Sequence, residues 1–201
     1  MMPPIVLAST SIYRKELLSR LGVNFICEKP TCDEEFEKEN LLALRKTPKE
    51  IAAALALAKA HSVLTKMSQS VIIASDQLIS FQDKILGKPH TKDEAHLQLR
   101  SLAGKTHELI TAVVILTPQQ IYTINHISKM SVKDLTDTEI TNYIAADNPI
   151  DCAGSYKIEK SGIGLFSNVE TSDFTAIQGL PLIWVSTKLK EIGYELFSQN
   201  K

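Results

Sequence analysis

Hydroxyl and basic side chains are concentrated at residues 9–15, which read Ser-Thr-Ser-Ile-Tyr-Arg-Lys. A short apolar run at residues 5–8 precedes them, and a leucine-bearing helical pattern follows and ends at Gly22. A strand, a loop and a helix are therefore expected. Backbone N–H groups and the helix dipole favour an anion at such a helix start. Ser9 and Arg14 are candidate phosphate ligands, although a helix cap with solvated basic residues explains the same pattern.

Acidic side chains follow two other segments. Asp76 comes directly after the apolar run at residues 71–75, and ligands of open α/β sheets gather at the carboxyl ends of strands. A carboxylate there can hold a divalent cation or take a proton from attacking water, provided that Glu34 or Asp33 shares the site. The alternatives are a turn aspartate and a solvated acidic loop.

Two lysines complete the set of candidates. Lys59 interrupts a helix rich in alanine and leucine, and Lys88 lies between glycine and proline in an expected rigid turn. If both point inward, they add compact positive charges that neutralise a polyphosphate; otherwise both are simply exposed. The five histidines show no metal-ligand spacing, and the chain contains no Walker loop, GxGxxG or GxSxG motif.

The elements that must position these residues alternate between strands and helices. Capping boxes predict helix starts at Thr47, Thr91 and Thr136, and a hairpin turn is expected near Gln82 and Asp83. Strands are expected at residues 5–8, 23–27, 71–75, 106–116, 121–132, 156–158 and 164–166, a long irregular stretch at 29–45, and a final helix between 179 and 193. The pattern predicts an α/β fold, with a central mixed β-sheet flanked by helices in one domain over residues 1–201.

The composition limits the partners. The 201 residues are 44% hydrophobic and 22% charged, and their formal net charge of −1 offers no broad positive field for a long nucleic acid. Three cysteines without a CxxC pair favour the reduced cytoplasm, and the apolar start is too short for a signal peptide or membrane span. A small phosphorylated ligand remains compatible with these features.

Short motifs in a fixed order resemble the Maf family of nucleotide pyrophosphatases, which has a Maf/ITPase-like fold. They are Leu7-Ala8-Ser9-Thr10-Ser11 with Arg14, Asp33-Glu34, Lys59-Ala60, Ser75-Asp76-Gln77, Gly87-Lys88-Pro89, Gly104-Lys105-Thr106-His107, Asp151-Cys152-Ala153-Gly154-Ser155-Tyr156 and Gly179-Leu180-Pro181-Leu182. The resemblance implies hydrolysis of a nucleoside triphosphate between its α and β phosphates with a divalent cation, Mg, Mn or Co not being distinguished.

The resemblance also implies roles for individual residues. Asp76 would accept a proton, Asp76 and Glu34 would hold the metal, and basic residues would act on the phosphates. The catalytic set is Asp76, Glu34, Lys59 and Lys88, and the phosphate-binding set is Ser9 and Arg14. A homodimer is a further expectation from the resemblance.

Three positions bear on the substrate. The branch of the family that acts on dTTP and UTP usually has arginine, threonine and glutamine where this chain has Tyr13, Gln77 and Glu159. The chain is instead similar to the branch that hydrolyses 7-methyl-GTP. Methylation at N7 makes guanine cationic, so an aromatic face and a carboxylate both favour it. For Glu159 the alternative is an exposed strand residue.

Two other functions remain open. One is a broader pyrophosphatase for dTTP, UTP or other noncanonical nucleotides. The other is a nucleotide-sensing regulator of cell division without turnover, against which the presence of both Asp76 and Glu34 argues.

Overall fold

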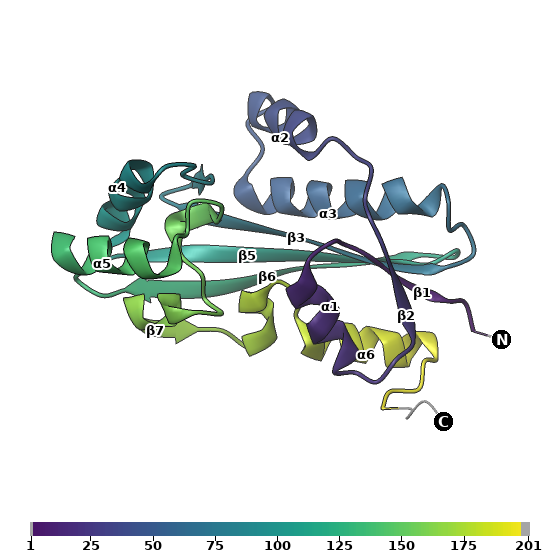
Figure 1. Ribbon diagram of the computed structural model, residues 1–201. Coiled ribbons are helices and arrows are strands. Elements are labelled where there is room, and N and C mark those ends of the chain that lie inside the picture. The colour runs from purple at the N-terminus through teal and green to yellow at the C-terminus, as the bar shows by residue number, and fades with distance from the viewer. Residues whose placement is uncertain (1, 198–201) are drawn as a thin grey trace. The chain divides into compact units, whose positions relative to one another are not determined.

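The computed structural model describes residues 2–197, and the chain divides into two compact units (Figure 1). The first unit contains Met1–Gln77, Thr111–His126 and Asp173–Lys201, and the second contains Leu78–Ile110 and Ile127–Ser172. Three long strands, β3 (Val71–Phe81), β5 (Thr106–Leu116) and β6 (Ile121–Val132), contribute residues to both units.

One mixed sheet runs through the chain in the order β2-β1-β3-β5-β6-β7, with β4 paired to β3. Strands β1 (Ile5–Ala8) and β2 (Phe25–Glu28) are parallel to each other, and β1 is parallel to β3. Strand β4 (Lys84–Leu86) is antiparallel to β3, and β7 (Phe166–Glu170) is antiparallel to β6. The predicted α/β class with a central mixed sheet is confirmed, whereas the single domain over residues 1–201 stays a prediction.

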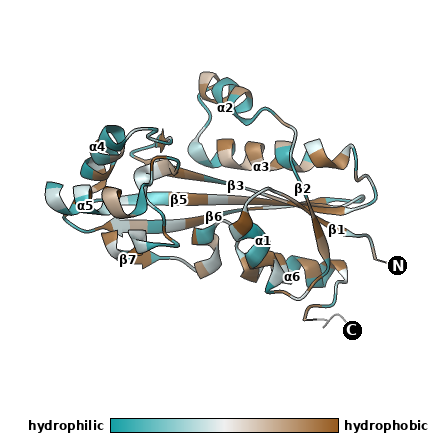
Figure 2. Cartoon of the chain, in the orientation of Figure 1, coloured by the Kyte–Doolittle hydropathy of each residue, from teal (hydrophilic) through white to brown (hydrophobic). Residues whose placement is uncertain are grey.

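Within the first unit, alternate residues of the strands face different helices, because successive side chains of a strand point to opposite faces. Ile5, Leu7, Val71 and Ile73 pack into one core with α1 (Ile12–Ser19) and α6 (Leu182–Ile192). The opposite face lies against α3 (Pro48–Leu64), on the other side of β1 and β3 in Figure 1. Figure 2 shows β1 in the brown of hydrophobic residues, as expected for a strand that is buried on both faces.

The second unit contains the other helices. They are α4 (Lys92–Leu102), α5 (Asp137–Asp147) and the short 3₁₀ helices η1 (Ala153–Ser155) and η2 (Ser161–Leu165). His107 and the rings of Tyr156 and Phe166 are buried together there. Within residues 2–197, no helix is both long and apolar enough to cross a membrane.

Local sequence signals predicted several boundaries correctly. Both halves of the capping boxes form at Thr47 with Glu50 and at Thr136 with Glu139. Gln82 and Asp83 have φ values of 51° and 60° and turn the chain between β3 and β4. Strands β5 and β6 have the predicted bounds.

Several expectations were wrong. Residues 29–45 are not irregular but contain α2 (Glu34–Ala43), whose N-cap is Asp33. The strand predicted to end before Asp76 continues to Phe81, since it gains β4 as a partner from Ile79 onward. Residues 156–158 form no strand: the chain turns there, between η1 and η2. The strand predicted at residues 164–166 begins only at Phe166, because Gly164 and Leu165 belong to η2.

Candidate active site

The loop between β1 and α1 presents hydroxyl groups to a small cavity. Ser9 is buried, and its Oγ accepts a hydrogen bond from the backbone N–H of Ser11 at 3.1 Å. Ser11 is the N-cap of α1 and accepts from the backbone N–H of Arg14. The helix cap considered as an alternative is therefore present at Ser11, and it orders the loop in which Ser9 lies.

The cavity beside this loop measures about 150 Å³. Eight residues line it, all in the first unit: Ala8, Ser9, Thr10, Ser11, Arg14, Pro30, Glu34 and Lys59. Ligand pockets of proteins usually span about 300–1,000 Å³. The cavity therefore has room for phosphate groups rather than for a whole nucleotide.

The ammonium group of Lys59 contacts both candidate acids. Its Nζ lies 2.6 Å from Asp76 Oδ1 and 2.9 Å from Glu34 Oε2. Lys59 and Asp76 are both buried, whereas about half of the Glu34 side chain is exposed. The helix α3 presents Lys59 to β3, and the first residue of α2 supplies Glu34, so three separate elements converge on one ammonium group.

The donor set around Asp76 fits a divalent cation. Asp76 Oδ2 is buried and makes no hydrogen bond to any other described residue. A buried carboxylate oxygen usually has a partner, so this one is suited to an ion or a proton. Among residues 2–197, no group of three or more His, Cys, Asp or Glu side chains is arranged to hold a metal. The carboxylates near the Lys59 ammonium group are those of Asp76 and Glu34, and both contact it.

Arg14 lines the same cavity and is held there by Gly179, which is distant in the sequence. Its Nε donates to the carbonyl oxygen of Gly179 at 3.1 Å, and Ser75 Oγ donates to the same carbonyl at 2.7 Å. Burial lowers the pKa of the Arg14 guanidinium, while the charges of Asp76 and Glu34 raise it. The bond to Gly179 fixes the edge of the guanidinium that carries Nε, and the two terminal amino groups take no part in that bond.

Asp76 and Gln77 lie on opposite faces of β3. Asp76 faces α3, whereas Gln77 Nε2 donates to Thr111 Oγ1 at 2.9 Å and to the carbonyl oxygen of Ala176 at 3.0 Å. Asp76 lies not at the end of a strand but between two ladders, because β3 pairs with β1 up to Ile73 and with β4 from Ile79. Asp76 therefore follows the end of the parallel pairing between β1 and β3, and not the end of β3 itself.

The remaining candidates are placed as follows. Tyr13 is exposed in the first turn of α1, next to Arg14. Lys88 is exposed between β4 and α4, and Glu159 is exposed in a turn, so its strand alternative is wrong. Lys88 and Glu159 both belong to the second unit.

Sequence reasoning missed the contacts that hold these residues. Thr111 holds Gln77, and the carbonyl of Gly179 accepts from both Arg14 and Ser75. None of Thr111, Ser75 and Gly179 was a candidate. Ser75 and Gly179 do fall within motifs of the family resemblance. Nothing in the local sequence around Thr111, in the middle of an apolar strand, indicates its partner 34 residues away.

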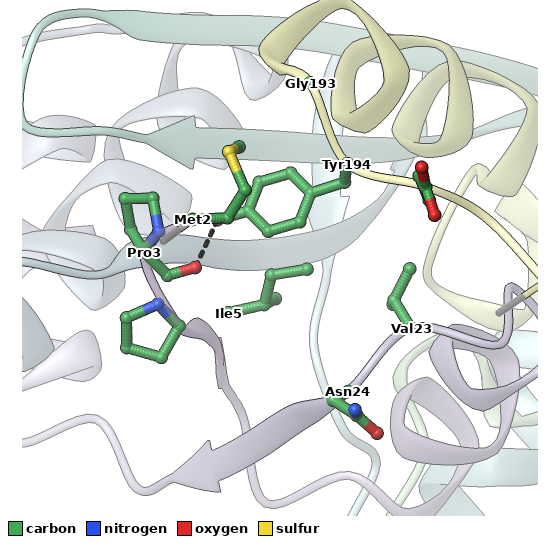
Figure 3. A pocket seen from close by; sticks show the side chains of 9 residues that line it. Met2, Pro3, Ile5, Val23, Asn24, Gly193 and Tyr194 are labelled. Atoms are coloured by element: carbon green, nitrogen blue, oxygen red, sulfur yellow. Dashed lines mark hydrogen bonds between the residues drawn. The ribbon is translucent and has the colours of Figure 1, made fainter. Parts of the chain in front are cut away.

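A larger cavity of about 480 Å³ lies elsewhere in the first unit (Figure 3). Its lining is mostly apolar, and Tyr194 Oη donates to the carbonyl oxygen of Pro3 at 2.6 Å across it. Among residues 2–197, Glu195 is the one carboxylate that lines it, and no lysine, arginine or histidine does. Without positive charge it is not suited to a polyphosphate, so the smaller cavity is the candidate active site.

Comparisons with known proteins identify relatives of this chain. The family model described as Maf-like protein matches residues 4–192. A Bdellovibrio bacteriovorus protein named 7-methyl-GTP pyrophosphatase is 50% identical over 179 residues, covering 89% of this chain and 92% of that protein. A protein of the same name from Hydrogenovibrio crunogenus is 39% identical over 198 residues, covering 97% and 96%. The solved structure of the Staphylococcus aureus Ham1 protein matches with a TM-score of 0.48 and 11% identity, over 93% of this chain and 99% of that one.

The family model extends from the residue before β1 to the last residue of α6 and includes every candidate site residue. From this match and the two relatives, the chain belongs to the family of Maf-like proteins.

Proposed function

We propose that this chain hydrolyses 7-methyl-GTP between its α and β phosphates, giving 7-methyl-GMP and pyrophosphate. Such a reaction removes a modified nucleotide from the pool. The names of the two relatives support this substrate. The observation that carries the proposal is the buried contact of Lys59 with Asp76 and Glu34 beside a hydroxyl-rich helix start.

In this proposal, positive charge at the cavity binds the phosphates of the substrate. Lys59 and Arg14 offset the charges of Asp76 and Glu34, which leaves the four groups together close to neutral. A triphosphate adds several negative charges, so further positive charge is needed for tight binding. Lys88 and a divalent cation supply it, while Ser9 and the N–H groups of the first turn of α1 bind phosphate oxygens.

Asp76 and Glu34 would hold the cation, and phosphates and water would complete its ligands, as is usual for Mg²⁺. When bound, such an ion withdraws charge from the phosphoryl oxygens. Asp76 takes the proton from the attacking water, a role for which a buried oxygen without a hydrogen-bond partner among the described residues is suited. Lys59 keeps this carboxylate oriented through its 2.6 Å contact.

Base selection is assigned to Tyr13, Gln77 and Glu159. A cationic 7-methylguanine gains from the face of Tyr13 and from the charge of Glu159, and neutral guanine gains less from both. Gln77 Nε2 is already bonded to Thr111 and Ala176, so its carbonyl oxygen is the atom that we assign to the base edge.

Four further predictions belong to this proposal. The chain acts as a homodimer, as a single domain, and in the cytoplasm, on a small nucleotide rather than on a long nucleic acid. Light scattering on the purified protein tests the first of these.

A nucleotide panel tests the function. Purified protein is incubated with Mg²⁺, Mn²⁺ or Co²⁺ and 7-methyl-GTP, GTP, dTTP or UTP, and the products are separated by chromatography. We expect 7-methyl-GMP and pyrophosphate in equal amounts and the highest kcat/KM for 7-methyl-GTP. A preference for dTTP or UTP would overturn the substrate, and binding without turnover would favour a sensor.

Asp76→Asn is the decisive variant, and turnover should fall at least about a hundredfold because it removes the general base. Asp147→Asn is the matched control. Asp147 is also a buried aspartate with an oxygen that makes no hydrogen bond to other described residues, but it lies in α5 of the second unit. Near-normal turnover of Asp76→Asn would exclude Asp76 as the general base.

A further inference from the structure

An exposed aromatic ring is held on a rigid segment of the first unit. Phe174 is 61% exposed and is the first residue of η3 (Phe174–Gln178). Its neighbour Asp173 is buried and accepts hydrogen bonds from the backbone N–H and hydroxyl of Thr175, at 2.9 and 2.6 Å, and from the backbone N–H of Ile183 at 2.8 Å. The backbone that presents Phe174 is therefore fixed at both η3 and α6.

The segment η3 lies next to the helix that carries Tyr13. Helices α1 and η3 are in contact, and Figure 1 shows the start of α1 beside the yellow-green turn that precedes α6. The bond from Arg14 Nε to the carbonyl of Gly179, the C-cap of η3, ties the two elements together. Tyr13 is 41% exposed, so both neighbouring elements present an aromatic side chain to solvent.

Gln77 is bonded to the same short helix. Its Nε2 donates to the carbonyl oxygen of Ala176, two residues after Phe174, and to Thr111 Oγ1. The side chain that is assigned to the base edge thus has its position set by η3. An aromatic ring on that helix and a polar amide bonded to it form the usual pair of groups that bind a base, one for its face and one for its edge.

We propose that Phe174 is a further base-binding residue, whose ring contacts the face of the 7-methylguanine base together with Tyr13. This inference rests on the proposed function. A positively charged base is attracted to the face of an aromatic ring more strongly than a neutral one, so Phe174 contributes to selectivity as well as to affinity. Because the base is remote from the bond that is cleaved, the contact acts on binding of substrate and transition state alike.

The test compares Phe174→Ala and Phe174→Trp with wild type. Replacement by alanine should raise KM for 7-methyl-GTP about tenfold, the size typical of one lost base–ring contact, and should leave kcat within about twofold. KM for GTP should rise less, and Phe174→Trp should retain the wild-type values. Binding of the product 7-methyl-GMP, measured by calorimetry, should weaken in Phe174→Ala by the same factor as KM rises.

Phe36→Ala is the matched control. Phe36 lies in α2 and is 60% exposed, so it tests the loss of an exposed ring as such, and we expect wild-type KM. If Phe174→Ala behaves like Phe36→Ala while wild type still prefers 7-methyl-GTP, the inference is overturned and the proposed function stands. If wild type itself shows no preference for 7-methyl-GTP over GTP, the proposed substrate fails. A change in molecular mass without a change in KM would assign Phe174 to an interface and overturn the inference.

Discussion

Removal of the Lys59 ammonium is the most informative perturbation of the site. The Lys59 and Asp76 side chains are each 8% exposed and 2.6 Å apart, whereas Glu34 is 48% exposed. Lys59→Met keeps an unbranched side chain that is one atom shorter, and it leaves the Asp76 carboxylate buried without the ammonium group that contacts it. Breaking one side of a buried pair costs about 3–5 kcal/mol. We expect this loss in the free energy of unfolding.

The Glu34 contact contributes far less. Because half of that side chain is in water, solvent screens the pair, and Glu34→Gln should cost less than about 1 kcal/mol. Its effect on turnover should nevertheless be large, because Glu34 is assigned to the metal. Glu34→Gln should therefore lower turnover with little loss of stability, whereas Lys59→Met should lower both.

A double-mutant cycle measured by urea denaturation tests the magnitude. Lys59→Met with Asp76→Leu removes both charges, and a buried pair can often be replaced by apolar residues at little net cost. The double variant should therefore be more stable than Lys59→Met alone.

Lys46→Met is the matched control, since Lys46 and Glu50 are also close, at 2.8 Å, but are both exposed. The free energy of unfolding of Lys46→Met should stay close to that of wild type, because solvent screens an exposed pair. A loss below about 1 kcal/mol for Lys59→Met, or single losses that simply add in the double variant, would refute the reasoning.

Two predictions concern the second unit. Burial lowers the pKa of His107 from 6.5 to about 4, so below pH 6.5 the unfolded chain binds a proton that the folded one does not. The free energy of unfolding should therefore fall by about 2 kcal/mol from pH 7 to pH 5, and His107→Gln should remove most of this loss. Equal pH dependence in wild type and His107→Gln would exclude His107 as the source of the loss. At the proposed specificity site, Glu159→Gln should lower the ratio of kcat/KM for 7-methyl-GTP over GTP by about threefold, the size for an exposed charge, and an unchanged ratio would remove Glu159 from that site.

Features that depend on neighbouring residues were predictable from the sequence. The capping boxes at Thr47 and Thr136 begin α3 and α5 as expected, because the bonds involved join residues only three apart. The missed helix α2 also has a local signal, since Asp33 is its N-cap and acidic residues fill its first turn. Its polarity led to the prediction of an irregular segment, because none of its residues is buried.

The candidate site, too, was predictable only in part from the sequence. Residue types and their order indicated Ser9, Arg14, Glu34, Lys59 and Asp76, and the structure places these five around one cavity and one buried ammonium group. The sequence did not indicate that Asp76 lies inside a longer strand or that Gln77 faces away from it. Strand β3 continues past Asp76 because it pairs with β4 through the turn at Gln82 and Asp83 and lies beside β5, which is distant in the sequence. The two-residue period of the extended strand then sends adjacent side chains to opposite faces.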